Sequence, residues 1–403
     1  MTTHHFSINE KRNKKDIIKI RIIRFICAIV PLTMLIACNS SKKEELGVAI
    51  YGYDNPMRQW GDSLTWSDFH CIGLEQPKDA FFTSIQRIDF CDSLIIIQGL
   101  EGLYTYNQRG QFRYKYGEKG HGQNEYVQLS AFCINSEKRE IQIIDSYSSK
   151  VISYDIGGNF QSSSIYPFGL TKDIFSGAYV GDGKLFTYHF VCRDRNVPFM
   201  SYSSPHNELT DVASFDMPTS NSKERFGYHP YMVTRDGSVN FVKPFDNIIY
   251  TFAGNVASPA YNIISEMKKY TKKEMEKMEY TSTINFNYEE DDHIFLGFTD
   301  VFETPTHIML NSFLNSQFLI DKSTMTGQRY RDYILEEGKF TSVPLINICA
   351  LKDDYFVGSQ TLSELSTLEF EENDDHSVQQ LQSLIKSMED EDDDRYVLLF
   401  YRL

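Results

Sequence analysis

The chain has 403 residues, of which 41% are hydrophobic and 14% aromatic, so it can bury a sizeable core and wholesale disorder is excluded. Acidic residues outnumber basic ones by 55 to 40, which gives a formal net charge of −15. Because no long basic stripe follows the first 25 residues, we expect no nucleic-acid partner.

The N-terminal segment has the charge and length of a secretion signal. Seven basic residues from Lys11 to Arg24 precede an uncharged run at residues 25–37, which is too short to span a bilayer as a helix. The run ends in Leu35-Ile36-Ala37-Cys38, which resembles a bacterial lipobox. We therefore predict a signal peptide at residues 1–37 and lipidation of Cys38. An ordinary signal peptide followed by a chance cysteine is the alternative.

Residues 38–47 are predicted to form a lipidated tether. Its Lys43-Glu44-Glu45 looks like the export signal that sends lipoproteins of Bacteroidota to the outer cell surface. This pattern predicts an outer-membrane lipoprotein exposed at the cell surface, or otherwise facing the periplasm, and attached to the membrane through Cys38. Removal of residues 1–37 leaves 33 basic and 53 acidic side chains, a charge that favours a protein held away from an anionic bilayer.

The remaining chain, residues 48–403, reads as β-structure almost throughout. Short runs of β-branched and aromatic residues alternate with polar turns, without the strand–helix alternation of a parallel α/β fold. A repeat of four strands is clearest at residues 84–116 and again at 129–166. Six turns mark the repeat at intervals of 44 to 68 residues, a spacing typical of propeller blades. The marks are Asp92, Ser136, Asp182, Asp236, Thr304 and Asp353.

Two helices and a closing strand complete the expected fold, an all-β six-bladed β-propeller with short helical inserts. A capping box beginning at Thr271 predicts a helical insert within residues 265–280, and a second one beginning at Ser377 predicts a helix at residues 377–388. The apolar run at residues 396–402 is expected to close the ring by pairing with N-terminal strand material, near residues 48–53 or 82–90.

With these features the chain resembles the TolB-like six-bladed β-propeller lipoproteins of Bacteroidota, whose blades are NHL-like. The resemblance covers roughly residues 48–403. It includes a glycine-rich connector after the first blade, in which Gly120, Gly122, Glu125 and Tyr126 match while Gln123 and Asn124 replace the usual Pro and Gly. It implies an architecture and no particular activity.

The connector is also the most distinctive candidate site, formed by Gly120, His121, Gly122, Glu125 and Tyr126. His121 and Glu125 could form an acid–base pair at the mouth of the channel. The alternative, a structural crossover between blades, is favoured because no third residue is evident to orient the pair.

Other chemistry-bearing residues are weighed in the same way. Asp145 and Asp321 follow apolar strands, so they either line the channel or cap turns. Five cysteines remain in the mature chain beyond Cys38, and neither a zinc site nor a disulfide framework is expected, although a single disulfide is left open. We expect no metal, because His189 with Cys192, the run 291–293 and the acidic run 389–394 lack ligand spacing. Exposed aromatics could stack on sugars or anchor a protein; they are Tyr51, Tyr53, Trp60 and Trp66.

No nucleophile or phosphate-binding motif is present, and no cofactor is expected. The sequence therefore predicts a non-catalytic binding or scaffold module for a protein or envelope component. The alternative is a protein that binds a glycan or small molecule, or a hydrolase or lyase, with its site at the propeller axis. The sequence leaves the oligomeric state open.

Overall fold

The computed structural model divides the chain into Met1–Leu46 and Gly47–Leu403. It describes residues 47–58, 67–77, 81–145, 147–165, 174–179, 184–189, 199–203, 208–213, 230–234, 237–243, 246–253, 256–269, 294–295, 297–312, 316–331, 339–340, 342–371, 374–387 and 395–403. The predicted signal peptide, Cys38 and most of the predicted insert at 265–280 lie outside these ranges.

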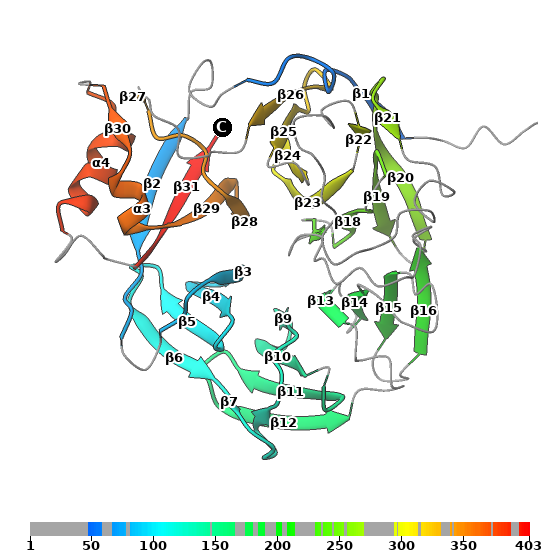
Figure 1. The fold of residues 1–403 in the computed structure, drawn as a ribbon. Helices are drawn as coiled ribbons and strands as arrows, with labels where there is room; N and C mark the ends of the chain where they lie inside the picture. Colours follow the sequence, from blue (N-terminus) through cyan, green and yellow to red (C-terminus); the bar gives the residue numbers. More distant parts are fainter. Residues whose placement is uncertain are drawn as a thin grey trace, which may run out of the picture. The chain divides into compact units, whose positions relative to one another are not determined.

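The unit from Gly47 onward is a β-propeller built from antiparallel sheets that follow one another in chain order (Figure 1). Sheet 1 contains β3 (Ile85–Cys91), β4 (Leu94–Gly99), β5 (Leu103–Asn107) and β6 (Phe112–Tyr116). Sheet 2 contains β9 (Ala131–Asn135), β10 (Glu140–Asp145), β11 (Lys150–Asp155) and β12 (Phe160–Ile165). Sheet 3 contains β13 (Ile174–Tyr179), β14 (Lys184–His189), β15 (Phe199–Ser203) and β16 (Glu208–Ala213).

The second half continues the pattern. Sheet 4 contains β17 (Tyr231–Val233), β18 (Val239–Val242), β19 (Ile248–Ala253) and β20 (Val256–Ile263). Sheet 5 contains β23 (Phe298–Glu303), β24 (His307–Ser312), β25 (Ser316–Asp321) and β26 (Thr326–Arg331). Sheet 6 contains β28 (Ile348–Lys352), β29 (Tyr355–Thr361), β31 (Tyr396–Arg402) and β2 (Asp68–Gly73). The first strand of each sheet, as named above, contacts the first strand of a neighbouring sheet. For example, β28 contacts β3, and β9 contacts β13.

The expected count of six four-stranded blades is wrong, because the described part of the chain forms five such blades. Five of these sheets are four-stranded, and sheet 4 has five strands because β1 (Val48–Ile50) joins its outer edge in parallel with β20. The chain then forms isolated bridges from Tyr51 and Arg58 to β26 of sheet 5. Residues 47–58, here called the strap, thus follow the outer edges of sheets 4 and 5. The strap uses backbone groups that an edge strand would otherwise leave unpaired.

Sheet 6 closes the propeller by combining both ends of the unit. β31 lies between β29 and β2 and pairs antiparallel with both, with Asp68 opposite Arg402 and Gly73 opposite Val397. The bounds of β31 coincide with the predicted closing strand. Its partner, however, is neither 48–53 nor 82–90 but β2, a strand with a single buried residue, Phe69, and therefore no apolar pattern to reveal it.

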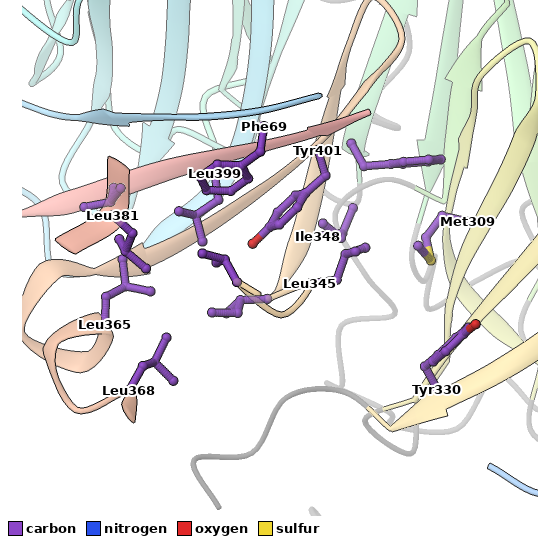
Figure 2. Packing of buried hydrophobic residues seen from close by; sticks show 14 of the residues in the cluster. Phe69, Met309, Tyr330, Leu345, Ile348, Leu365, Leu368, Leu381, Leu399 and Tyr401 are labelled. Carbon is purple, nitrogen blue, oxygen red and sulfur yellow. The ribbon is translucent and has the colours of Figure 1, made fainter. Parts of the chain in front are cut away.

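Sheet 6 also carries the two described helices, α3 (Leu362–Ser366) and α4 (His376–Ile385). Their apolar residues Leu365 and Leu381 join a core cluster with Leu399 of β31, and Met309 and Tyr330 of sheet 5 belong to the same cluster (Figure 2). This packing on one side gives α4 its amphipathic pattern. Short strand pairs link β7 (Glu118–Lys119) with β8 (Glu125–Tyr126), β21 (Lys268–Lys269) with β22 (Ile294–Phe295), and β27 (Lys339–Phe340) with β30 (Glu369–Phe370).

Helix α4 was predicted at residues 377–388 but spans His376–Ile385, and its N-cap lies two residues before the predicted one. Asp375 is its N-cap, and the carboxylate accepts hydrogen bonds from the backbone N–H groups of Ser377 at 2.8 Å and Val378 at 3.1 Å. We expect Asp375→Ala to lower the free energy of unfolding by about 1 kcal/mol. Denaturant unfolding checks this result, with the exposed neighbour Asp374→Ala as the control that should change little. Equal losses in both variants would contradict the capping role.

Sheet 6, which β2 and β31 close, should become less stable in acid because of His70 on β2. The imidazole stacks on Phe400 with ring centroids 4.4 Å apart, and burial lowers its pKa although Asp68 opposes the shift. His70 therefore binds a proton less readily in the folded state than in the unfolded state. The free energy of unfolding should fall as the pH drops through the pKa of His70 in the unfolded chain, about 6.5. We expect His70→Gln to reduce the loss of stability between about pH 7 and pH 5. Identical pH slopes in urea titrations of the variant and the wild type would contradict this assignment.

Candidate functional site

A cavity of about 660 Å³ opens where the turns of sheets 4, 5 and 6 meet. In each of these sheets, the turn between the first two strands contributes residues to the cavity wall. Lys322, which lies in the turn after β25, also contributes. These turns emerge on one face of the propeller because the first strands run in the same direction. The lining residues are Met232, Val233, Thr234, Ser238, Asn240, Thr251, Glu303, Thr304, Pro305, Lys322, Leu351 and Asp353.

Glu303 is the centre of a hydrogen-bond network in the cavity wall. Its side chain is only 11% exposed, and its Oε1 accepts from Lys322 Nζ at 2.5 Å and from Tyr261 Oη at 3.4 Å. Asn240 donates its amide to the other carboxylate oxygen. Its own amide oxygen accepts from Thr251 Oγ1 at 2.5 Å. The carboxylate is thus held in one orientation and neutralised by Lys322.

Lys322 is positioned by a second contact, since its ammonium also donates to the carbonyl oxygen of Thr304 at 3.3 Å. At the rim, the carboxylate of Asp353 lies 3.3 Å from Lys352 Nζ. The remaining wall combines hydroxyl groups with the apolar side chains of Met232 and Leu351. Such a mixture of apolar surface and a few oriented polar groups is typical of a ligand site.

The propeller axis has a different character. Arg87 of β3 is buried, and its guanidinium donates to the carbonyl of Phe132 in sheet 2 at 3.2 Å and to Tyr231 Oη in sheet 4 at 3.3 Å. It also pairs with Asp89 at 2.5 Å and lies over the Phe132 ring. Burial opposes the charge of Arg87, but Asp89 and the other partners raise its pKa overall. Inner strands of three sheets are therefore tied together by one side chain.

The comparisons with known proteins agree with this architecture. A family model described as "Domain of unknown function (DUF4934)" matches residues 62–401. The chain belongs to this family. No curated protein matches the sequence.

Among solved structures, the DUF4934 chain is similar to a candidate exported protein from Bacteroides fragilis, with 19% identity and a TM-score of 0.64 over 88% of this chain and 99% of the other. A member of the DUF4221 family from Bacteroides vulgatus matches at 8% identity with a TM-score of 0.48, over 86% and 99% of the two chains. The first likeness supports the propeller fold alone, and the second is too distant for an argument. The TolB-like relationship stays a prediction.

The connector of the DUF4934 chain, residues 117–126, folds into the short β7–β8 pair. The carboxylate of Glu125 accepts the backbone N–H of Gly122 at 2.8 Å, and a Cβ at Gly120 would lie 2.0 Å from that carboxylate. Lys150 Nζ donates to the carbonyl oxygens of Gly122 at 2.8 Å and Glu125 at 2.9 Å. His121 is exposed. These contacts favour the structural alternative for the connector.

Asp145 and Asp321 both cap turns. Asp145 is fully buried and accepts from the backbone N–H groups of Val127, Gln128, Tyr147 and Ser148. Asp321 accepts from the backbone and hydroxyl of Ser323, both at 2.7 Å, and these bonds lower its pKa. Neither carboxylate lines the cavity described above.

Four cysteines in the described ranges are free thiols: Cys71, Cys91, Cys133 and Cys349. Burial raises the pKa of Cys71 to about 11 and that of Cys133 and Cys349 to about 12, so these thiols are poor nucleophiles at neutral pH. Cys192 lies outside the described residues.

The aromatic residues predicted to be exposed differ in their environments. Tyr51 is exposed on the strap, but Tyr53 is buried against Phe295, Phe298 and Phe318 and is a core residue, which corrects its prediction as a loop tip. Trp60, Trp66, the run 291–293 and the run 389–394 lie outside the described residues.

Within the described ranges, no three His, Cys, Asp or Glu side chains gather as a metal site requires. No helix in the same ranges is long and apolar enough to cross a membrane.

The sequence did not reveal the cavity, because its residues come from separate turns between Met232 and Asp353. Asn240 gives a local signal, since it is a buried amide within the apolar strand β18. A polar side chain at such a position needs a partner. Nothing in the sequence identified Glu303 as that partner.

Proposed function

We propose that the protein is a lipid-anchored envelope protein whose propeller binds a ligand in the cavity between the turns of sheets 4, 5 and 6. The observation that carries this proposal is the oriented Glu303–Lys322–Asn240 network in a cavity of about 660 Å³. Both carboxylate oxygens of Glu303 already accept hydrogen bonds from the protein. This arrangement suits recognition by fixed polar groups better than proton transfer.

The anchoring part of the proposal is based on the sequence alone, namely the basic segment, the uncharged run and Cys38. We do not propose catalysis at the axis, because the charged group found there, Arg87, is engaged in an ion pair with Asp89 and in two aromatic contacts. The binding role of the cavity does not depend on anchoring, so the two parts can be tested separately.

The test uses a photoreactive residue placed in the full-length protein in intact cells. Val233 lines the cavity and is 37% exposed, whereas Tyr147, 68% exposed, lies on the turn between β10 and β11. We expect a crosslinked ligand or partner from position 233 and none from position 147. Equal labelling from both positions, or none from position 233 when the protein is abundant, would overturn the binding role of the cavity. A Cys38→Ala variant tests anchoring, because it should release the protein from the membrane fraction.

A further inference from the structure

Glu303, Asp353 and Lys322 are the charged residues that line the cavity, and each carboxylate has a cationic partner, of which Lys352 lies outside the lining. Glu303 is neutralised by Lys322 at 2.5 Å, and Asp353 at the rim lies 3.3 Å from Lys352. An anionic ligand would approach two carboxylates, and a cationic one would approach an ammonium group already held by Glu303 and the carbonyl of Thr304. Transfer of a charged group into such a site has a desolvation penalty without a free counter-charge. The cavity therefore favours a neutral ligand.

The neutral polar groups of the wall act mainly as acceptors toward a ligand, because the hydroxyls of Thr234, Thr251 and Thr304 already donate within the protein. Thr234, Ser238, Thr251 and Thr304 contribute hydroxyl groups, and Asn240 contributes an amide. Thr251 donates to Asn240, which in turn donates to Glu303, so the oxygen of Thr251 keeps lone pairs that can accept from a ligand. Glu303 Oε2, which accepts from Asn240, likewise keeps acceptor capacity, whereas Oε1 already accepts from both Lys322 and Tyr261. A ligand hydroxyl can donate to these acceptors.

The other part of the wall is apolar. Met232, Val233, Pro305 and Leu351 line the same cavity, so a ligand must present apolar surface as well as hydroxyl groups. A pyranose ring has this combination, with C–H groups on its faces and hydroxyl groups along its edges. A simple polyol or an inorganic ion lacks the extended apolar face.

We infer that the cavity takes a neutral, hydroxyl-rich ring ligand, that is, an uncharged short saccharide, either free or as the end of a larger glycoconjugate. This inference rests on the proposed binding function and specifies its ligand class. Glu303 and Asn240 bind ring hydroxyls, and Leu351 and Pro305 pack against the ring.

The experiment is a calorimetric titration of the full chain in detergent with neutral hexose disaccharides, their uronic-acid counterparts and their methyl glycosides. We expect the neutral sugars to bind and the uronic acids to bind at least about tenfold more weakly. Retained binding of the methyl glycosides would indicate the end of a glycoconjugate, and its loss a free reducing sugar. Glu303→Gln should weaken neutral-sugar binding about tenfold, since it removes a charged acceptor. Ser238→Ala provides a milder change at the rim.

The matched control is Asp92→Asn in a second cavity of about 450 Å³, lined by Asp92, Arg113, Tyr114 and Arg139. It should leave sugar affinity unchanged, and unfolding curves of all variants check that they fold. Preference for uronic acids, no binding of any sugar, or neutral-sugar binding that Glu303→Gln and Ser238→Ala leave unchanged would overturn the ligand class. If crosslinking from position 233 still captures a partner in that case, the binding function survives and only the saccharide assignment fails.

Discussion

Replacing Arg87 by leucine is expected to lower the free energy of unfolding by about 3 kcal/mol, the lower end of the range for a broken buried ion pair. Asp89 would lose its partner, although its 31% exposure moderates the penalty. The carbonyl of Phe132 and the hydroxyl of Tyr231 would each lose a donor, in sheets 2 and 4. Because one side chain connects strands of three sheets, its loss should loosen the inner strands together.

Two measurements check this prediction for Arg87→Leu. Denaturant unfolding gives the stability change, and the rate at which a thiol reagent modifies Cys133 reports access to the inner strands, since Cys133 is fully buried on β9. The control is Arg139→Leu, which breaks an exposed pair with Asp92 and should change stability by less than about 1 kcal/mol. A stable variant with an unreactive Cys133 would show that Arg87 is not the tie between the sheets.

Asp145→Ala is expected to destabilise the fold by about 2–4 kcal/mol, because four backbone N–H groups lose one shared acceptor. Two of these groups, in Val127 and Gln128, belong to the segment that enters sheet 2 after the connector. The other two, in Tyr147 and Ser148, form the turn between β10 and β11. One carboxylate therefore fixes two chain segments that are distant in sequence.

The matched variant is Asp321→Ala, which removes a cap from an exposed turn and should change stability by less than about 1 kcal/mol. Chemical denaturation of both proteins distinguishes the two carboxylates, and Asp145→Asn should recover part of the loss because its amide oxygen still accepts. Similar small effects at both positions would contradict the proposed role of Asp145 as an internal acceptor.

The sequence allowed prediction of the elements whose own residues decide their structure. The apolar run of β31 requires a buried strand, and Val378 and Leu381 place one face of α4 against sheet 6. The pairing partner of β31 could not be inferred in the same way. β2 is an outer strand with one buried residue, and the more apolar Val48–Ile50 instead covers the edge of sheet 4. The pairing of an outer strand depends on which sheet edge is available to it. The residue pattern of the strand itself does not contain this information.

The candidate site was harder to predict than the fold. The connector was distinctive because its glycines, Glu125 and Tyr126 are close in sequence, yet these residues stabilise their own loop. The cavity residues Asn240, Glu303 and Lys322 are ordinary in their local context and become a network only when sheets 4 and 5 pack together. Turn residues on a propeller combine across sheets, so linear motifs do not describe them.

The strap has a mechanical consequence for a tethered protein. A force applied at Gly47 would first load the three residue pairs between β1 and β20, and then the bridges of Tyr51 and Arg58 to β26. Only after these had detached would the load reach β2, whose six residue pairs with β31 close the propeller. The strap would therefore detach before the pairing of β2 with β31 is loaded. If the proposed anchor at Cys38 is pulled, the protein could lengthen at the edge of sheets 4 and 5 while the cavity between sheets 4, 5 and 6 stayed intact.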